Sequence, residues 1–318
     1  MRLATLKRGG RDGTLVAVSA DGARVAEVPG WPTLQMALDD WEAALPALRG
    51  AAIAAETGQG VAATDFAAPL PRAWQWLDGS AFPTHGELMQ QAFNLPPIET
   101  DRPLMYQGLS HRFIPPTDDV PLPSEADGID FEGEFGIVTG DVPMGCTAEA
   151  ALAHIRLIVM INDWSLRAIA PVEMKTGFGW VRAKPACSVA PFAVTPEQLG
   201  DAWRNGRVHL PLTVEVNGQW FGSPVGDAME FGFHELIAHA AHSRSLPAGT
   251  IIGSGTVSNA GHADVGSTCI SERRAIEMIE HGALRTPFLS FGDRVAMRAG
   301  SGASPFGELD QRVASGIG

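Results

Sequence analysis

The chain has 318 residues, with 23 Lys and Arg against 36 Asp and Glu, and a formal net charge of −13. This acidic balance argues against a nucleic-acid binder, because such proteins need a basic face. The 45% hydrophobic residues suffice for a core and exclude a disordered chain. Three widely spaced cysteines indicate reduced thiols, and the longest strongly apolar run, residues 157–161, is too short to span a membrane. We therefore expect a cytoplasmic protein.

The first 70 residues predict a small domain of short strands and one helix. Residues 3–6 and 14–19 carry strand-forming side chains between glycine-rich turns. Leucines then recur at helical spacing from Leu34 to Leu48, and Gly50 is a plausible stop for this helix. Residues 57–72 lack periodicity and suggest a linker. We expect an N-terminal α/β domain over residues 1–70 and a second domain over residues 71–318.

The second domain is predicted to be rich in strands. The clearest element is a hairpin, in which apolar residues alternate over residues 210–216, Asn217-Gly218 forms the turn and Trp220 begins the return. We expect helices over residues 147–156 and 234–243. We expect strands over residues 129–139, 157–162, 250–253 and 287–297. Strands interleaved with short helices favour an α+β, mainly β architecture, a mixed β-roll or sandwich, over a doubly wound sheet.

Residues 128–137 carry the first candidate site. On a strand, alternation places Asp130, Glu132 and Glu134 on one face. Glu132 and Glu134 then lie roughly 6.5–7 Å apart along the strand. Two carboxylates that share a pocket need a bound proton or a cation between them. An amphipathic strand with its acidic face in water is the alternative interpretation of these residues alone.

A third carboxylate follows the apolar run of residues 157–161, which is typical of a strand buried on both faces. Asp163 lies where this strand ends and is well placed to bind an ion, although Asn162-Asp163 also suits an ordinary turn. Three carboxylates without nearby His or Cys ligands favour a hard cation over zinc. We expect Mg²⁺ or Mn²⁺, with Ca²⁺ as a further option.

Taken together, the motifs resemble those of the fumarylacetoacetate hydrolase family, and in particular its bacterial two-domain members. The resemblance covers residues from about 68 to the C-terminus. It rests on four blocks: Asp130-Phe-Glu-Gly-Glu134, Asn162-Asp-Trp-Ser-Leu-Arg167, Lys184 in Val181-Arg-Ala-Lys-Pro185, and Gly253-Ser-Gly-Thr-Val-Ser258. It implies a mixed β-roll catalytic domain behind the small N-terminal domain, and a homodimer. It also implies that Glu132, Glu134 and Asp163 hold the divalent cation and that Lys184 reaches the same pocket.

The activity implied is hydrolysis of a carbon–carbon bond in a 2,4-dioxo acid of the acylpyruvate, fumarylpyruvate or fumarylacetoacetate type. Three carboxylates and a divalent cation sum to −1, and Lys184 and Arg167 bring the site to +1, which suits a small anionic oxo acid. The departing carbon group would leave as an enolate with its charge on a metal-bound oxygen. A general base must then deliver water to the 4-carbonyl.

His85 is our candidate for this base. Many family members carry a glutamate three residues after the matching histidine, but here the acid is Glu87, two residues on, and such positions do not face each other on a helix. Glu272 is a second candidate partner. Longer members place a ligating aspartate nearby, where the closest match is Thr84, so no fourth protein ligand is assigned. His85 could instead be a partly exposed histidine on a loop. Thr256 and Gln107 are candidate substrate-binding residues.

Two alternatives remain open at this point. The same enolate chemistry serves a decarboxylase, hydratase or isomerase of related oxo acids. A different class is a non-catalytic member of the fold that binds a metal or a small acid. The feature that separates hydrolysis from the other reactions is a His–acid pair able to hold water over the substrate. Neither alternative includes a nucleic acid or a membrane as a partner.

Overall fold

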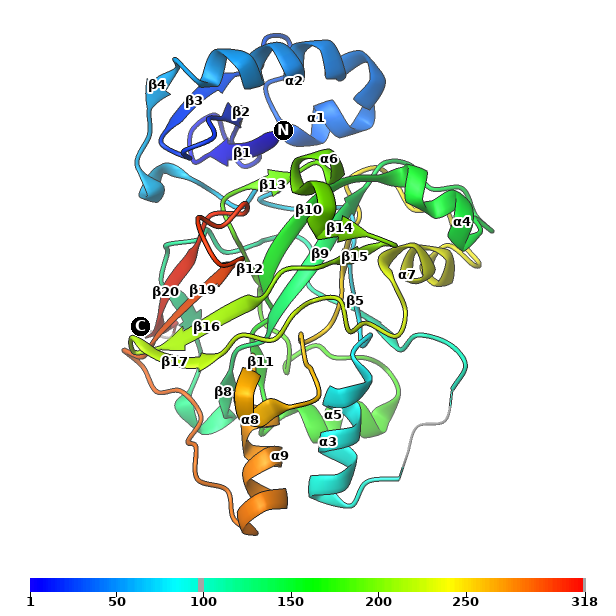
Figure 1. The fold of residues 1–318 in the computed structure, drawn as a ribbon, viewed down its shortest axis with the longest axis vertical. Helices are drawn as coiled ribbons and strands as arrows, with labels where there is room; N and C mark the ends of the chain where they lie inside the picture. Colours follow the sequence, from blue (N-terminus) through cyan, green and yellow to red (C-terminus); the bar gives the residue numbers. More distant parts are fainter. Residues whose placement is uncertain (97–99, 317–318) are drawn as a thin grey trace.

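A computed structural model describes residues 1–96 and 100–316 of the chain. Its largest sheet has 11 strands and joins the N-terminal strands at the top of Figure 1 to strands in the middle of the molecule. In spatial order the strands are β4 (Gln59–Gly60), β3 (Arg24–Glu27), β2 (Thr14–Val18), β1 (Arg2–Leu6), β13 (Ala193–Val194), β10 (Ile155–Asn162), β9 (Gly133–Thr139), β18 (Ile251–Gly253), β5 (Trp76–Gly79) and β6 (Met105–Gln107), with β12 (Ser188–Val189) paired to β10.

Three smaller sheets and a set of short helices complete the fold. A five-stranded sheet has the order β17 (Gln219–Gly222), β16 (Leu212–Val216), β19 (Arg294–Ala299), β20 (Leu309–Ser315) and β7 (Val120–Leu122). The two-stranded sheets are β8 (Ile129–Asp130) with β11 (Ser165–Leu166), and β14 (Trp203–Arg204) with β15 (Arg207–Val208). The helices are α1 (Leu34–Asp39), α2 (Trp41–Ala55), α3 (Pro83–Phe93), α4 (Ala148–Ala151), α5 (Ala170–Thr176), α6 (Pro196–Leu199), α7 (Phe233–Ala240), α8 (His262–Val265) and α9 (Ile270–His281), with 3₁₀ turns η1 (Ala63–Asp65), η2 (Glu125–Asp127), η3 (Leu152–His154) and η4 (Gly200–Ala202).

The N-terminal part packs α1 and α2 on strands β1 to β4, at the top of Figure 1. The strands expected at residues 3–6 and 14–19 are confirmed as β1 and β2. The expected single helix is wrong in two respects, because it breaks at Asp40 and because it passes Gly50 to end at Ala55. Ala51 and Ala55 continue its buried face, so packing carries the helix beyond the glycine.

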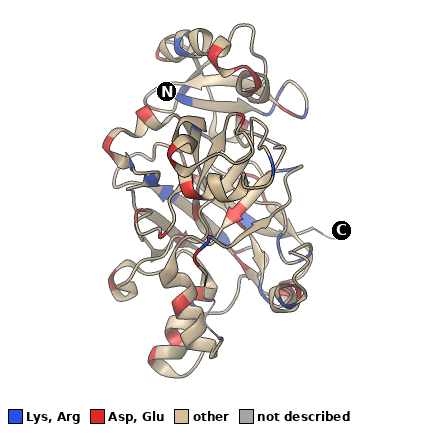
Figure 2. Ribbon diagram, turned by 90° about the vertical axis from the view of Figure 1, so that its right-hand side faces the viewer, with Lys and Arg blue, Asp and Glu red and all other residues tan. Residues whose placement is uncertain are grey.

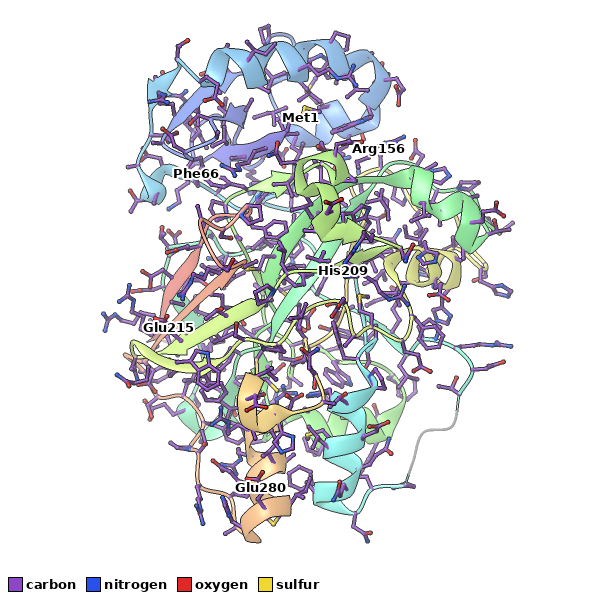
Figure 3. All side chains as sticks on the ribbon, viewed as in Figure 1. Met1, Phe66, Arg156, His209, Glu215 and Glu280 are labelled. Carbon is purple, nitrogen blue, oxygen red and sulfur yellow. The ribbon has the colours of Figure 1, made fainter. Side chains whose placement is uncertain are left out.

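The two parts share a sheet, since β1 pairs antiparallel with β13. The α-amino group of Met1, labelled at this junction in Figure 3, donates a hydrogen bond to Thr195 Oγ1 at 2.8 Å. The fold is therefore a mixed α/β arrangement of a small N-terminal part and a larger C-terminal part. The boundary at residue 70 remains a prediction.

The predicted hairpin is confirmed. β16 and β17 are joined by Asn217 and Gly218, whose φ angles of 51° and 75° lie in the left-handed region that this turn requires.

The other elements expected in this part are found with changed bounds. The strand expected over residues 250–253 corresponds to β18, and the helix expected over residues 234–243 corresponds to a shorter α7. Of residues 287–297, only those from Arg294 onward form a strand. The helix expected over residues 147–156 stops early, because β10 already begins at Ile155.

The strand expected over residues 129–139 is interrupted. β8 ends at Asp130 and pairs with β11, whereas β9 begins at Gly133 and pairs with β10 and β18. Phe131 and Glu132 lie between them, and both faces of the segment are buried. The alternative of an acidic strand face in water is therefore wrong.

Charged positions are distributed over most elements of the ribbon, with Lys and Arg interspersed among Asp and Glu (Figure 2). Within residues 1–96 and 100–316, no helix combines the length and the apolar character needed to cross a membrane.

The packing of the core predicts that two phenylalanines contribute differently to the free energy of unfolding. Phe306 is fully buried against Phe135, whereas Phe178 is 97% exposed. Phe306→Ala should lower the free energy of unfolding by about 3–5 kcal/mol, because it leaves a cavity. Phe178→Ala should change it by less than about 0.5 kcal/mol. Urea unfolding followed by tryptophan fluorescence measures both, and similar losses for the two variants would contradict this packing.

Candidate metal centre

Three carboxylates from separate strands meet inside the C-terminal part. Oxygen atoms of Asp78, Glu134 and Asp163 all lie within 4.8 Å of one another, and all three residues are buried. Asp78 belongs to β5, Glu134 to β9, and Asp163 directly follows β10. Glu134 is paired with Ile161, so β9 and β10 bring two of the three acids together.

Asp78 reaches this cluster across an intervening strand. β18 lies between β9 and β5, and its Gly253 is paired with both Asp78 and Gly136. A Cβ atom at Gly253 would lie 2.4 Å from Asp78 Oδ1 and 2.9 Å from Glu134 Oε2. The glycine therefore leaves the space in which the two carboxylates approach each other.

The cluster fits a divalent cation. In the part of the chain that the structure describes, neither buried carboxylate oxygen of Glu134 has a hydrogen-bond partner. Burial, followed by the neighbouring carboxylates, raises the pKa of Asp78 and of Glu134 well above their usual values. An all-oxygen ligand set suits a hard ion such as Mg²⁺ or Mn²⁺. Asp78, Glu134 and Asp163 are the residues that would hold it.

Glu132, predicted as a ligand, lies beside this cluster in a network of donors. Its Oε1 accepts hydrogen bonds from Lys184 at 2.7 Å, Arg167 at 2.9 Å and Ser165 at 2.5 Å, and its Oε2 accepts one from the Thr256 hydroxyl. Burial alone would raise the pKa of Glu132, but Lys184 and Arg167 outweigh it and hold the pKa well below its usual range. Glu132 is therefore ionised, and its role as a further ligand remains a prediction.

Lys184 connects Glu132 to the three-acid cluster. Its ammonium also donates to Asp163 Oδ2 at 2.5 Å. Burial would lower the pKa of Lys184, but Asp163 and Glu132 together raise it above the usual value, so the side chain stays protonated. The ammonium lies 5.4 Å and 5.2 Å from the ring centroids of Tyr106 and Trp180, which stack on each other.

Asp163 has further donors. The Tyr106 hydroxyl donates to its Oδ2 at 2.6 Å, and the Cys187 thiol donates to its Oδ1 at 2.9 Å. Burial and then the Asp163 charge raise the pKa of both donors well above their usual values, so both keep their protons. These bonds fix the orientation of the carboxylate.

The charge count differs from the sequence-based one because Asp78 was not included there. Four buried carboxylates face two cations, Lys184 and Arg167, which leaves two negative charges. A divalent ion would bring this group to zero rather than to the expected +1. Asp130, bonded to Arg167 at 2.8 Å, adds one more negative charge. An anionic ligand must therefore be held by specific donors rather than by a net positive site.

His85 is paired with Glu272 and not with Glu87. His85 Nδ1 lies 2.9 Å from Glu272 Oε2, and the Glu272 side chain is 1% exposed. Glu87 is exposed on α3, as expected for a position two residues from His85 on a helix. α3 and α9, which lie together at the bottom of Figure 1, pack through Leu88, Ala275 and Ile276.

Short chain connections link this pair to the strands that carry the acidic cluster. α3 begins five residues after Asp78, and His85 lies in its first turn. Just before α9, the carbonyl of Thr268 accepts a hydrogen bond from Gly133 N, next to Glu134. Both members of the pair are thereby connected to the strands that carry the carboxylates.

Of the three predicted substrate-binding residues, Arg167 and Thr256 lie in the Glu132 network and Gln107 does not. Gln107 is exposed and pairs with Leu77 in the β5–β6 ladder, whereas Tyr106 pairs with Asp78. Strand alternation thus turns Tyr106 and not Gln107 toward the cluster. Asp78 was missed at the sequence level, where Thr84 was considered instead. Its signal was an acidic residue within the short apolar segment Trp76–Gly79.

Comparison with known proteins identifies the family. Residues 75–314 match the model of the fumarylacetoacetate (FAA) hydrolase C-terminal domain, and residues 1–72 match fumarylacetoacetase N-terminal domain 2. The chain belongs to the fumarylacetoacetate hydrolase family.

Individual relatives carry several activities. The chain is 26% identical to 2,4-didehydro-3-deoxy-L-rhamnonate hydrolase of Sphingomonas sp. (strain SKA58) over 246 residues, which are 74% of this chain and 81% of that protein. It is 26% identical to the mitochondrial oxaloacetate tautomerase Fahd2a of Rattus norvegicus over 157 residues, 48% of each chain.

Solved structures share the fold over nearly the full length. The maleylpyruvate hydrolase from Sphingobium sp. SYK-6, in complex with manganese(II) ion and pyruvate, has a TM-score of 0.64 at 20% identity, covering 99% of this chain and 100% of that one. A 5-carboxymethyl-2-hydroxymuconate delta-isomerase from Mycobacterium smegmatis has a TM-score of 0.63 at 20% identity, covering 99% of both chains.

The raised pKa values of Asp78 and Glu134 predict proton release on metal binding. In the metal-free native state these groups hold protons that the unfolded chain has already lost, so stability falls as pH rises from about 4 toward the raised values. Mn²⁺ must displace those protons, so its affinity should increase with pH and up to two protons should be released per ion. Calorimetric titrations in buffers of different ionisation enthalpy measure this.

Glu134→Gln serves as the control, since it removes one of the titrating ligands and should abolish most of the Mn²⁺ binding. Binding of Mn²⁺ to the natural protein without proton release and without pH dependence would show that these carboxyls do not hold the ion.

Proposed function

We propose that this protein is a divalent-cation-dependent hydrolase that cleaves a carbon–carbon bond in 2,4-dioxo acids of the acylpyruvate type. The observation that carries this proposal is the His85–Glu272 pair, held on two packed helices whose chain connections lead to the strands of the buried carboxylates. A His–acid pair can activate the water that hydrolysis consumes and that a rearrangement of the same acid does not need.

The carboxylate cluster provides the ion site, with Glu132 as its predicted fourth member. A divalent cation bound there would supply Lewis-acid polarisation of the oxygens of an oxo acid. Lys184 stays protonated between Glu132 and Asp163 and can bind a substrate oxygen. Arg167, held by Asp130 and Glu132, contributes a second fixed positive charge.

His85 supplies the base. In the tautomer whose Nδ1–H donates to the Glu272 carboxylate, Nε2 carries the lone pair that takes a proton from water. The water oxygen adds to the 4-carbonyl carbon, and the bond between carbons 3 and 4 then breaks with its electron pair on carbon 3. Protonation of that carbon completes the reaction, so that one dioxo acid and one water give a carboxylic acid and a 2-oxo acid. Glu272 stabilises the imidazolium that forms in between.

A tautomerase acting on a small oxo acid is the second candidate, since the oxaloacetate tautomerase of Rattus norvegicus is among the relatives. Tautomerisation moves a proton between carbon and oxygen and needs no water. The two activities therefore differ in their dependence on a base that activates water, and they differ in product.

The test is an assay of acetylpyruvate and fumarylpyruvate cleavage with Mn²⁺ or Mg²⁺, beside oxaloacetate tautomerisation and decarboxylation. We expect metal-dependent release of pyruvate from a dioxo acid, and His85→Gln should lower kcat by about 100-fold or more while Mn²⁺ binding is retained. His281→Gln, a matched change on α9 at an exposed histidine, should have little effect. Tautomerisation of oxaloacetate without turnover of any dioxo acid by the metal-loaded protein would overturn the hydrolase assignment.

A further inference from the structure

Asp130 is a fully buried carboxylate that the reaction above does not use. Its two carboxylate oxygens accept hydrogen bonds from four donors. Its Oδ1 accepts from the backbone N–H groups of Phe131 at 2.8 Å and Ile270 at 2.7 Å, and its Oδ2 accepts from Ser271 N at 2.9 Å and Arg167 Nε at 2.8 Å. Asp130 is also absent from the group of carboxylates whose oxygens converge. Its position thus suits a structural anchor and not an ion ligand.

Two of these donors are the first two residues of α9. A helix begins with N–H groups that lack partners within the helix, and the residue preceding α9 is Cys269, whose sulfur is a weak acceptor for Glu272 N at 3.2 Å. The carboxylate of Asp130 therefore takes over much of the capping that a Ser or Asp would provide. Glu272, the third residue of this helix, is thereby held where its side chain meets His85.

The hydrogen bond from Arg167 connects Asp130 to the network around Glu132. Arg167 donates its Nε–H to Asp130 and its Nη2–H to Glu132, so that the guanidinium is held by two carboxylates from the same chain segment. β8 and β11 support this arrangement, because Ser165 is the ladder partner of Asp130. One carboxylate thus connects the His85–Glu272 pair with the Arg167–Glu132–Lys184 network.

We propose that Asp130 is a positioning residue that holds Glu272 and Arg167 in a common frame, so that the water-activating pair and the cationic side chains face one substrate together. This inference rests on the proposed function for its catalytic consequence, whereas the anchoring itself can be measured without a substrate. Charge-assisted bonds to a buried carboxylate are strong, and loss of the charge leaves two helix N–H groups poorly satisfied.

The test compares Asp130→Asn with Asp310→Asn in the full-length, Mn²⁺-loaded protein. Asp310 also pairs with an arginine, Arg294, but on an exposed surface strand. In Asp130→Asn we expect faster hydrogen exchange at the amides of Ile270 and Ser271 and shifted ¹⁵N signals of the His85 ring. In Asp310→Asn neither should change. These readouts do not depend on turnover, so they remain decisive even if no dioxo acid is cleaved.

Catalysis gives the second readout. Asp130→Asn should lower kcat for the dioxo acid by about 10- to 100-fold, with KM close to that of the natural protein, because Asp130 does not contact substrate. In a double-mutant cycle, Asp130→Asn should cause a smaller loss in the Glu272→Gln background than in the natural protein, because only its effect through Arg167 remains there. If Asp130→Asn does not fold alone, the same cycle is measured in the Cys269→Ser background, where a serine cap supports the first turn of α9.

The proposal is overturned if exchange at Ile270 and Ser271 and the His85 ring signals in Asp130→Asn match those of Asp310→Asn, or if the losses from Asp130→Asn and Glu272→Gln are additive. Absence of dioxo-acid turnover in the natural protein, with the exchange and ring signals changed as expected in the variant, would instead remove the proposed function and retain the anchoring role.

Discussion

Electrostatic balance among buried charges governs the site. Asp78, Glu132, Glu134 and Asp163 lie together out of water, and Lys184 and Arg167 offset part of their charge. Like charges this close in a region of low dielectric are unfavourable unless protons or a cation intervene. The fold accommodates them because strands β9, β18 and β5 approach closely at Gly253, where a side chain would occupy the space between Asp78 and Glu134. A divalent ion is the simplest completion of this arrangement.

Local patterns predicted the elements whose geometry is set by a few neighbouring residues. Alternation around Asn217-Gly218 gave the hairpin, and the apolar run before Asn162 gave β10. Tertiary contacts determined the bounds of the elements that were predicted wrongly. α2 continues past Gly50 because Ala51 and Ala55 are buried against the N-terminal strands. The strand expected over residues 129–139 is interrupted because Asp130 is bound to α9 and Arg167, whereas Gly133 pairs with β10.

The site shows the same division. Glu132, Glu134, Asp163 and Lys184 lie in recognisable blocks, and the structure brings these four side chains into one buried region. Asp78 was not found from the sequence, and Glu272 was only the second candidate partner of His85. Both roles depend on contacts over long chain separations: Asp78 meets Glu134 across β18, and Glu272 lies 187 residues from His85. Spacing rules describe neighbours on one helix or strand, so they could argue against Glu87 as the partner of His85 but could not select Glu272.

Anomalous diffraction from crystals soaked in Mn²⁺ tests the central claim most directly. We expect one strong peak within coordination distance of carboxylate oxygens of Asp78, Glu134 and Asp163, and no such peak in Glu134→Gln crystals treated in the same way. A fully soaked crystal with these three carboxylates in place and no peak between them, or with the ion bound elsewhere, would contradict the account.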